Sequence, residues 1–186
     1  FSNEKEGEIY ISKSEMYLNV GTIENKSVQI IKETSDFKPV SLEILNTVTD
    51  RNSGKVQEIN KTATFTGNEV NIVSEDYKGK FKITTPFVLD GNYFFNELLK
   101  KKFKKGTVVR SYIYEPTVEL DEPILVIVEM AGYEDVDMNG EKKNLMHVKQ
   151  KVEKLKSIDM YLNEQGITEK AVIKMLNNIF ELVKVD

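Results

Sequence analysis

Short stretches in which apolar and polar residues alternate with a period of two recur along most of the chain. Ile158, Met160 and Leu162, for example, alternate with Asp159 and Tyr161. Such a strand has one apolar face and one face suited to water, which is typical of antiparallel sheets. Turn residues interrupt the stretches at intervals of about 8–12 residues. The pattern predicts a mainly β (α+β) protein with about 10–12 antiparallel strands.

Glycine and asparagine mark the places where these strands reverse direction. The predicted turns include Asn52-Ser53-Gly54, Gly67-Asn68, Asn139-Gly140 and Glu164-Gln165-Gly166, all of which contain residues that tolerate a positive φ. Residues 17–24 contain Gly21 but otherwise alternate between apolar and polar side chains, and they are predicted to form one strand.

One segment has a helical period. Its apolar residues, three and four positions apart, are Phe95, Leu98, Leu99 and Phe103. The spacing predicts a helix over residues 91–105, with Asp90 or Asn92 as the N-cap and Gly106 at the stop. Because a single sheet needs a second layer to bury its apolar face, we expect this helix to be covered by a curved sheet or half-barrel.

The last stretch of the chain fits two structures. The apolar residues between positions 172 and 180 fit a helical stripe, whereas Asn177-Asn178 between two β-rich runs fits a hairpin. The hairpin is favoured for residues 168–185. No repeat or low-complexity linker separates the chain into parts, so one half-barrel-like domain is predicted over residues 1–186.

Composition excludes several classes of protein. The chain has 186 residues, 40% of them apolar and 30% charged, a net charge of −4 and no cysteine. The negative net charge argues against nucleic-acid binding, and no apolar run is long enough for a transmembrane segment. Without cysteine there is no disulfide, thiolate nucleophile or cysteine-bound metal. No cofactor is predicted. The chain begins Phe-Ser-Asn, so we expect a signal segment to be missing from this sequence.

The segment that starts at Asp135 resembles the first half of an EF-hand calcium loop. Asp135, Asp137 and Asn139 occupy its first, third and fifth positions, followed by Gly140. Position twelve should be glutamate and is Met146. A hairpin tip with flanking acids in solvent is therefore favoured, and weak surface calcium binding by the three residues is the alternative.

His147 is the only histidine of the chain. It is predicted to be solvent-facing or partly covered, because its strand neighbours Met146 and Val148 point to the opposite face. The paired acids Glu75-Asp76 and Asp121-Glu122 are predicted to lie in solvated loops. No catalytic residue is predicted.

Aromatic residues crowd the start of the predicted helix. They are expected either to belong to the core or to line an apolar cavity, and the candidate ligand-binding residues are Phe87, Tyr93, Phe94, Phe95, Leu99 and Phe103. The run Lys100–Lys105 fits the C-terminal end of a helix, where positive charge is favourable. Its alternative role is contact with anionic lipid or an acidic partner.

The order of these features resembles a bacterial family of secreted or envelope-associated proteins of unknown function. It is also similar to the domain that precedes transglutaminase-like domains in exported proteins. The segments that carry the resemblance are Val20-Gly21-Thr22 in an early strand, Asp50–Gly54, Lys105-Gly106, Glu115-Pro116, Gly132–Val136 before Asn139-Gly140, and Asp159–Gly166. The chain lacks the downstream domain and its cysteine.

The resemblance implies a curved half-barrel around a helix, similar to periplasmic lipoprotein-localisation carriers, which hold acyl chains in an apolar concavity. It implies an extracytoplasmic location (periplasmic, secreted or lipid-anchored) and no catalytic residue. We therefore expect a non-enzymatic envelope protein that binds a lipid, another apolar ligand or an envelope protein partner on its concave face. One alternative is an interaction domain with a filled core. The other is a hydrolase that uses His147 buried in a cleft against a carboxylate.

Overall fold

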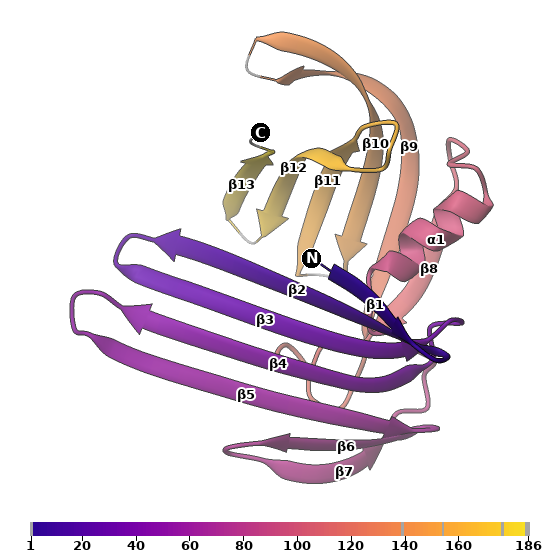
Figure 1. The fold of residues 1–186 in the computed structure, drawn as a ribbon. Helices are drawn as coiled ribbons and strands as arrows, with labels where there is room; N and C mark the ends of the chain where they lie inside the picture. Colours follow the sequence, from indigo (N-terminus) through magenta and orange to yellow (C-terminus); the bar gives the residue numbers. More distant parts are fainter. Residues whose placement is uncertain (1, 139, 154, 176, 185–186) are drawn as a thin grey trace. The chain divides into compact units, whose positions relative to one another are not determined.

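A computed structural model describes residues 2–138, 140–153, 155–175 and 177–184, in which thirteen strands and one α-helix are found (Figure 1). The mainly β prediction with a single helix is confirmed. The strands are β1 (Ser2–Glu6), β2 (Ile9–Val20), β3 (Ile23–Thr34), β4 (Pro39–Asp50), β5 (Lys55–Thr66), β6 (Glu69–Ser74), β7 (Lys78–Lys82), β8 (Val108–Ile113), β9 (Ile124–Met138), β10 (Glu141–Val152), β11 (Lys156–Leu162), β12 (Thr168–Met175) and β13 (Asn178–Val183). The helix α1 spans Asn92–Lys100.

The strands form two antiparallel sheets instead of one continuous curved sheet. Sheet A has the order β1-β2-β3-β4-β5-β6-β7, and sheet B has the order β13-β12-β11-β10-β9-β8. The chain divides accordingly into two compact units. Unit 1 consists of Phe1–Asp90 and Tyr114–Pro123, and unit 2 of Gly91–Ile113 and Ile124–Asp186. One domain over residues 1–186 stays a prediction.

Sheet A is a meander in which every strand turns back on the one before it. The single strand predicted over residues 17–24 is wrong, because the chain reverses at Gly21 and Thr22 between β2 and β3. Gly21 has a φ of +61° there, a conformation that costs a residue with a side chain more than it costs glycine. The alternation continues on both sides of the turn, which is why the two strands look like one in the sequence.

One face of sheet A carries the core of unit 1, and we call it the inner face. Its buried residues are Ile31, Leu42, Ile44, Ala63, Val70 and Ile72. They belong to four neighbouring strands and share one face because directly paired residues point the same way. Residues 114–123 complete this core with Tyr114, whose ring centroid lies 5.7 Å from that of Phe65.

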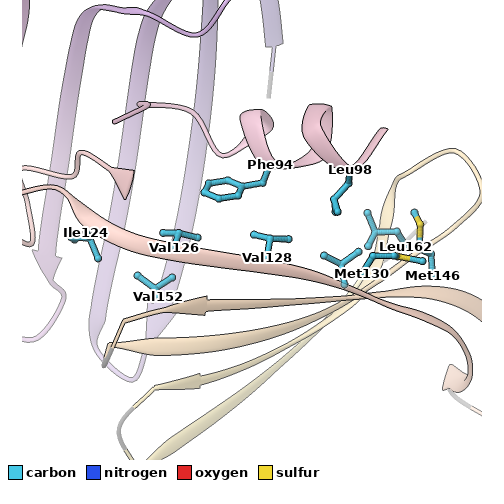
Figure 2. Close-up of a cluster of buried hydrophobic side chains, with 10 residues drawn as sticks. Phe94, Leu98, Ile124, Val126, Val128, Met130, Met146, Val152 and Leu162 are labelled. Carbon is cyan, nitrogen blue, oxygen red and sulfur yellow. The ribbon is translucent and has the colours of Figure 1, made fainter. Parts of the chain in front are cut away.

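Helix α1 supplies the second layer of unit 2. Its buried side chains, Phe94 and Leu98, point onto one face of sheet B, as Figure 2 shows. The strand residues that meet them are Ile124, Val126, Val128, Met130, Met146, Val148, Val152 and Leu162. The prediction that the helix covers an apolar sheet face is thus confirmed for sheet B.

Helix α1 is shorter than the predicted 91–105. It ends at Lys100 because Lys102 and Phe103 adopt positive φ values of 53° and 48°. The N–H of Phe103 donates to the carbonyl of Leu98 and closes the last turn. The N-cap is Gly91 and not Asp90 or Asn92, and no side-chain hydrogen bond caps the helix.

Two predicted hairpins are confirmed. Strands β12 and β13 pair antiparallel from Met175 and Asn178 onward, so the C-terminal stretch is a hairpin and not a helix. Strands β9 and β10 pair from Met138 and Glu141 onward, which is the hairpin expected in place of a calcium loop. Among the described residues, no helix has the length and apolar character needed to cross a membrane.

Candidate functional site

The candidate ligand-binding residues of helix α1 lie mostly in or against a filled core. Phe94 is 2% exposed, and the partly buried side chains packed against the same cluster include Tyr93, Phe95 and Phe103. Leu99 points away from it and is 60% exposed. These residues come together as predicted, but in the described structure they fill space between the helix and sheet B.

Phe87, the sixth candidate, belongs to unit 1. Its ring centroid lies 5.6 Å from that of Phe65 and 5.4 Å from that of Tyr114. It also lines a hollow of about 360 Å³ together with Pro39 and Pro86. The predicted set is therefore divided between the cores of two units.

The inner face of sheet A has a second apolar region that sequence reasoning did not single out. It lies beyond the buried core, toward the turns at Gly21 and Gly54, and we call it the open end. Its residues are Met16, Leu18 and Val20 on β2, Ile23 and Asn25 on β3, Asn46 and Val48 on β4, and Ile59 on β5.

The apolar side chains at the rim of the open end are accessible. Met16, Leu18, Val20 and Ile23 are between 41% and 59% exposed. Scattered surface apolar residues are normal, but a contiguous group on one sheet face marks a binding surface or an interface. The open end therefore has the character of an uncovered binding face.

Residues 115 and 116 mark where the cover of the inner face ends. The amide of Gln29 donates to Glu115 at 3.5 Å, and Nζ of Lys61 donates to the carbonyl of Pro116 at 2.8 Å. Gln29 and Lys61 lie on the inner face between the buried core and the open end. The segment after β8 thus closes the core of unit 1 at this point.

Two buried polar atoms lie among the apolar side chains of the open end. The side-chain oxygens of Asn25 and Asn46 accept no hydrogen bond from the described residues. A buried carbonyl without a donor costs about 1–3 kcal/mol. The open end thus contains two acceptors that have no donor among the described residues and lie beneath its accessible apolar side chains.

His147 on β10 is buried, with 8% exposure, so the prediction of a solvent-facing or partly covered histidine is wrong. Tyr161 on the neighbouring strand stacks on its ring with 4.6 Å between centroids. Its Nδ1 lies 2.8 Å from Oε2 of Glu134, and its Nε2 lies 2.9 Å from Oδ1 of Asp159. The histidine thus links β9, β10 and β11.

The arrangement around His147 favours a structural link between strands over acid–base catalysis. A neutral imidazole can donate only one of the two hydrogen bonds to Glu134 and Asp159, whereas the imidazolium donates both. With both ring nitrogens facing carboxylates, neither is free to take a proton from a substrate. The hydrolase hypothesis required His147 to be buried next to a carboxylate, and it is. However, neither of its ring nitrogens is free to act on a substrate.

Asp159 also contacts Lys174, whose Nζ lies 3.4 Å from Oδ2. Burial raises the pKa of Asp159, but the hydrogen bond with His147 and the charge of Lys174 outweigh it and hold the pKa below its usual value. Because this pKa is depressed in the folded state, the stabilising contribution is present above about pH 4 and is lost as pH falls through the folded pKa.

Replacing His147 with leucine is expected to lower the free energy of unfolding by about 1–3 kcal/mol at pH 7, because leucine offers no donor to the partly buried Asp159. Lys174→Gln is the control and should cost less than about 0.5 kcal/mol, since Lys174 is largely exposed. Urea denaturation at pH 7 and pH 4 measures both. Equal losses for the two variants would contradict the assigned link.

The carboxylates at the β9–β10 hairpin have local roles. Oδ1 of Asp135 accepts a hydrogen bond from Asn144 at 2.7 Å, and Oδ1 of Asp137 accepts the N–H of Gly140 at 2.7 Å. Asn139 lies outside the described residues. Among the described residues, no group of three or more His, Asp or Glu side chains is arranged to hold a metal ion.

Glu33 on β3 is a buried acid that sequence reasoning missed. It is 4% exposed on the inner face of sheet A, and its Oε1 accepts the N–H of Leu89 at 2.8 Å. Burial and the nearby charge of Asp90 raise the pKa of Glu33 to about 7. Its partner is a backbone group 56 residues away, so no local sequence signal marks the site.

The lysine run after helix α1 is solvent-exposed. Lys100 lies in the last turn and pairs with Glu97 at 2.6 Å, and the lysines that follow belong to the turn. The position at the helix end agrees with the favourable interaction of positive charge with the helix dipole. The alternative contact with anionic lipid stays a prediction.

The comparisons with known proteins support the fold. No protein-family model matches the chain, and no curated protein matches it in sequence. The crystal structure of a β-barrel-like protein with a domain of unknown function from Brucella abortus superposes with a TM-score of 0.61 and 12% identity, covering 90% of this chain and 76% of that one. At this identity the match shows a shared fold alone. It agrees with the expected bacterial β-barrel-like fold of unknown function, while the transglutaminase link stays a prediction.

Proposed function

We propose that the chain is a non-enzymatic module of the bacterial cell envelope that binds an apolar chain, such as the acyl chain of a lipid, at the open end of sheet A. The observation that carries the proposal is the contiguous, accessible apolar surface formed by residues such as Met16, Leu18, Val20 and Ile23. Leu18 and Ile23 are already more than half buried, so covering the exposed part of each would contribute roughly 1 kcal/mol.

The extracytoplasmic location is part of this proposal. Its support is the resemblance to secreted and envelope-associated proteins and a chain without cysteine, which folds equally well in an oxidising compartment. Fractionation of cells that express the complete gene, with immunodetection of the protein, tests the location. Recovery in the cytoplasmic fraction alone would contradict it.

Binding of a fluorescent undecanoic acid carrying a dansyl group tests the ligand site. Leu18→Glu places a charge on the inner face at the open end and is expected to weaken binding about tenfold or more, which corresponds to ~1.4 kcal/mol. Tyr17→Glu is the matched control, because Tyr17 is the adjacent residue, is also exposed and points to the opposite face. Its affinity should stay within about twofold of the wild type.

A third variant distinguishes ligand binding at the open end from ligand binding at the helix residues predicted from the sequence. Leu99→Glu changes the exposed apolar residue of helix α1. If the ligand binds on the exposed side of the helix at Leu99, this variant loses affinity and Leu18→Glu does not. Native mass spectrometry of gently purified protein, combined with lipid extraction, shows whether a ligand copurifies.

A second candidate function is a protein-interaction domain without a small-molecule site. The filled cores favour it, since Leu42 and Leu98 are almost completely buried. In that case the wild-type protein binds no probe and yields no lipid, and the open end is the first surface to test for a protein partner.

A further inference from the structure

The four edge strands of the two sheets differ in how they are protected. An exposed edge offers free backbone N–H and C=O groups, and proteins guard such edges with charged residues, proline or bulges. The edges β1, β7 and β8 carry charges on their strands, namely Glu4, Lys5 and Glu6, then Lys78, Lys80 and Lys82, and finally Arg110. The fourth edge, β13, carries only the charge of Glu181.

Strand β13 reads Asn-Ile-Phe-Glu-Leu-Val and is apolar on both faces. Ile179 is 70% exposed, and Phe180 and Leu182 are exposed as well. The one charge, on Glu181, is already paired with Lys170 of the neighbouring strand at 2.8 Å. β13 is therefore an edge suited to accepting another strand.

The backbone pattern shows which residues of β13 face outward. The N–H of Lys184 donates to the carbonyl of Glu169, and pairing proceeds in register to Met175 and Asn178. Since hydrogen-bonded pairs alternate along an antiparallel ladder, the even-numbered residues of β13 bond to β12. The free N–H and C=O groups belong to Ile179, Glu181 and Val183.

We propose that β13 pairs antiparallel with β13 of a second copy of this chain, with Phe180 on the two-fold axis. In this register Ile179 of each copy faces Glu181 of the other, and both residues have their backbone groups directed outward. The two Phe180 rings meet in a non-hydrogen-bonded pair, the closer of the two pair types. Aromatic pairs of this kind add to the stability of a sheet.

We take the partner of β13 to be a second copy of the chain, because the strand is complementary to itself in this register. A register centred on Glu181 would place two carboxylates opposite each other, which is unfavourable. A register centred on Leu182 would place Phe180 opposite Lys184. The pairing centred on Phe180 brings the two Phe180 rings together and opposes no like charges, and it joins the two copies of sheet B edge to edge.

Sedimentation equilibrium of the full chain over a range of concentrations tests the assembly. The wild type is expected to dimerise, and Ile179→Lys should raise the dissociation constant about tenfold or more. Val108→Lys is the matched control, because it adds the same charge at the opposite edge of the same sheet. Its dissociation constant should stay within about twofold. A wild type that stays monomeric overturns the proposal.

Disulfide crosslinking tests the register, and the chain has no cysteine to interfere. Phe180→Cys should form a covalent dimer on oxidation, since non-hydrogen-bonded partners have Cα atoms about 4.5 Å apart and disulfides span about 4.4–6.8 Å. In the same register the two copies of Leu182→Cys lie about 13 Å apart and should not crosslink. Crosslinking of Leu182→Cys, or none with Phe180→Cys, overturns the assigned pairing.

Discussion

Replacing Phe94 with alanine is expected to lower the free energy of unfolding by about 3–5 kcal/mol. The side chain is almost completely buried between helix α1 and β9, and its ring makes an edge-to-face contact with Tyr93 at 5.4 Å between centroids. Removing it deletes one of the two buried side chains by which the helix is attached to sheet B. The loss should appear in urea denaturation followed by circular dichroism.

Leu99→Ala provides the matched control on the same helix. Leu99 is exposed, so its removal should change the free energy of unfolding by less than about 0.5 kcal/mol. The comparison of these two variants also tests whether the predicted ligand-binding residues around this helix line a cavity. If Phe94 lined an open cavity instead of a packed core, its replacement would cost no more than that of Leu99.

Stability is expected to fall by about 3 kcal/mol as pH rises from 4.5 to above 7, because Glu33 must ionise in a buried position. The folded-state pKa of Glu33 is raised to about 7 from a usual value of 4.5, mainly by burial. An acid whose pKa is raised in the folded state does not lower stability below its unfolded-state pKa, because there it is protonated in both states. The penalty grows as pH passes through the interval and is complete above the folded pKa.

Glu33→Gln should remove this pH dependence and make the protein more stable than the wild type at pH 8. The glutamine oxygen can still accept the N–H of Leu89, while the charge is gone. Glu43→Gln on the neighbouring strand is the control, since Glu43 is exposed and its substitution should leave the pH profile unchanged. Denaturant titrations at several pH values measure the effect. Parallel profiles for wild type and Glu33→Gln would show that Glu33 has an ordinary pKa.

The sequence predicts the elements of this fold well because their signals are local. Alternation marks the strands, and turn residues such as Gly54 and Gly140 mark the reversals. The apolar spacing around Phe95 and Leu98 marks the helix. Its end was missed because Lys102 and Phe103 adopt left-handed backbone conformations, which lysine and phenylalanine rarely do.

The sites are harder to predict because their partners are distant in the sequence. His147 is covered by side chains from β9 and β11, and their pairing register decides which residues surround it. Glu33 is buried by the segment that carries Leu89. The open end has the same alternation as the covered half of sheet A. Only the hydrogen bonds that residues 115 and 116 form with Gln29 and Lys61 show where the covered part of the inner face ends.

The division of unit 1 into two chain segments has a consequence for synthesis on the ribosome. The seven strands of sheet A emerge first, but their core includes Tyr114, which is made only after residues 91–113 of the other unit. At about 5–20 residues per second this is a delay of roughly 1–5 s. During that interval the nascent sheet lacks part of its cover, which makes it a natural substrate for chaperones.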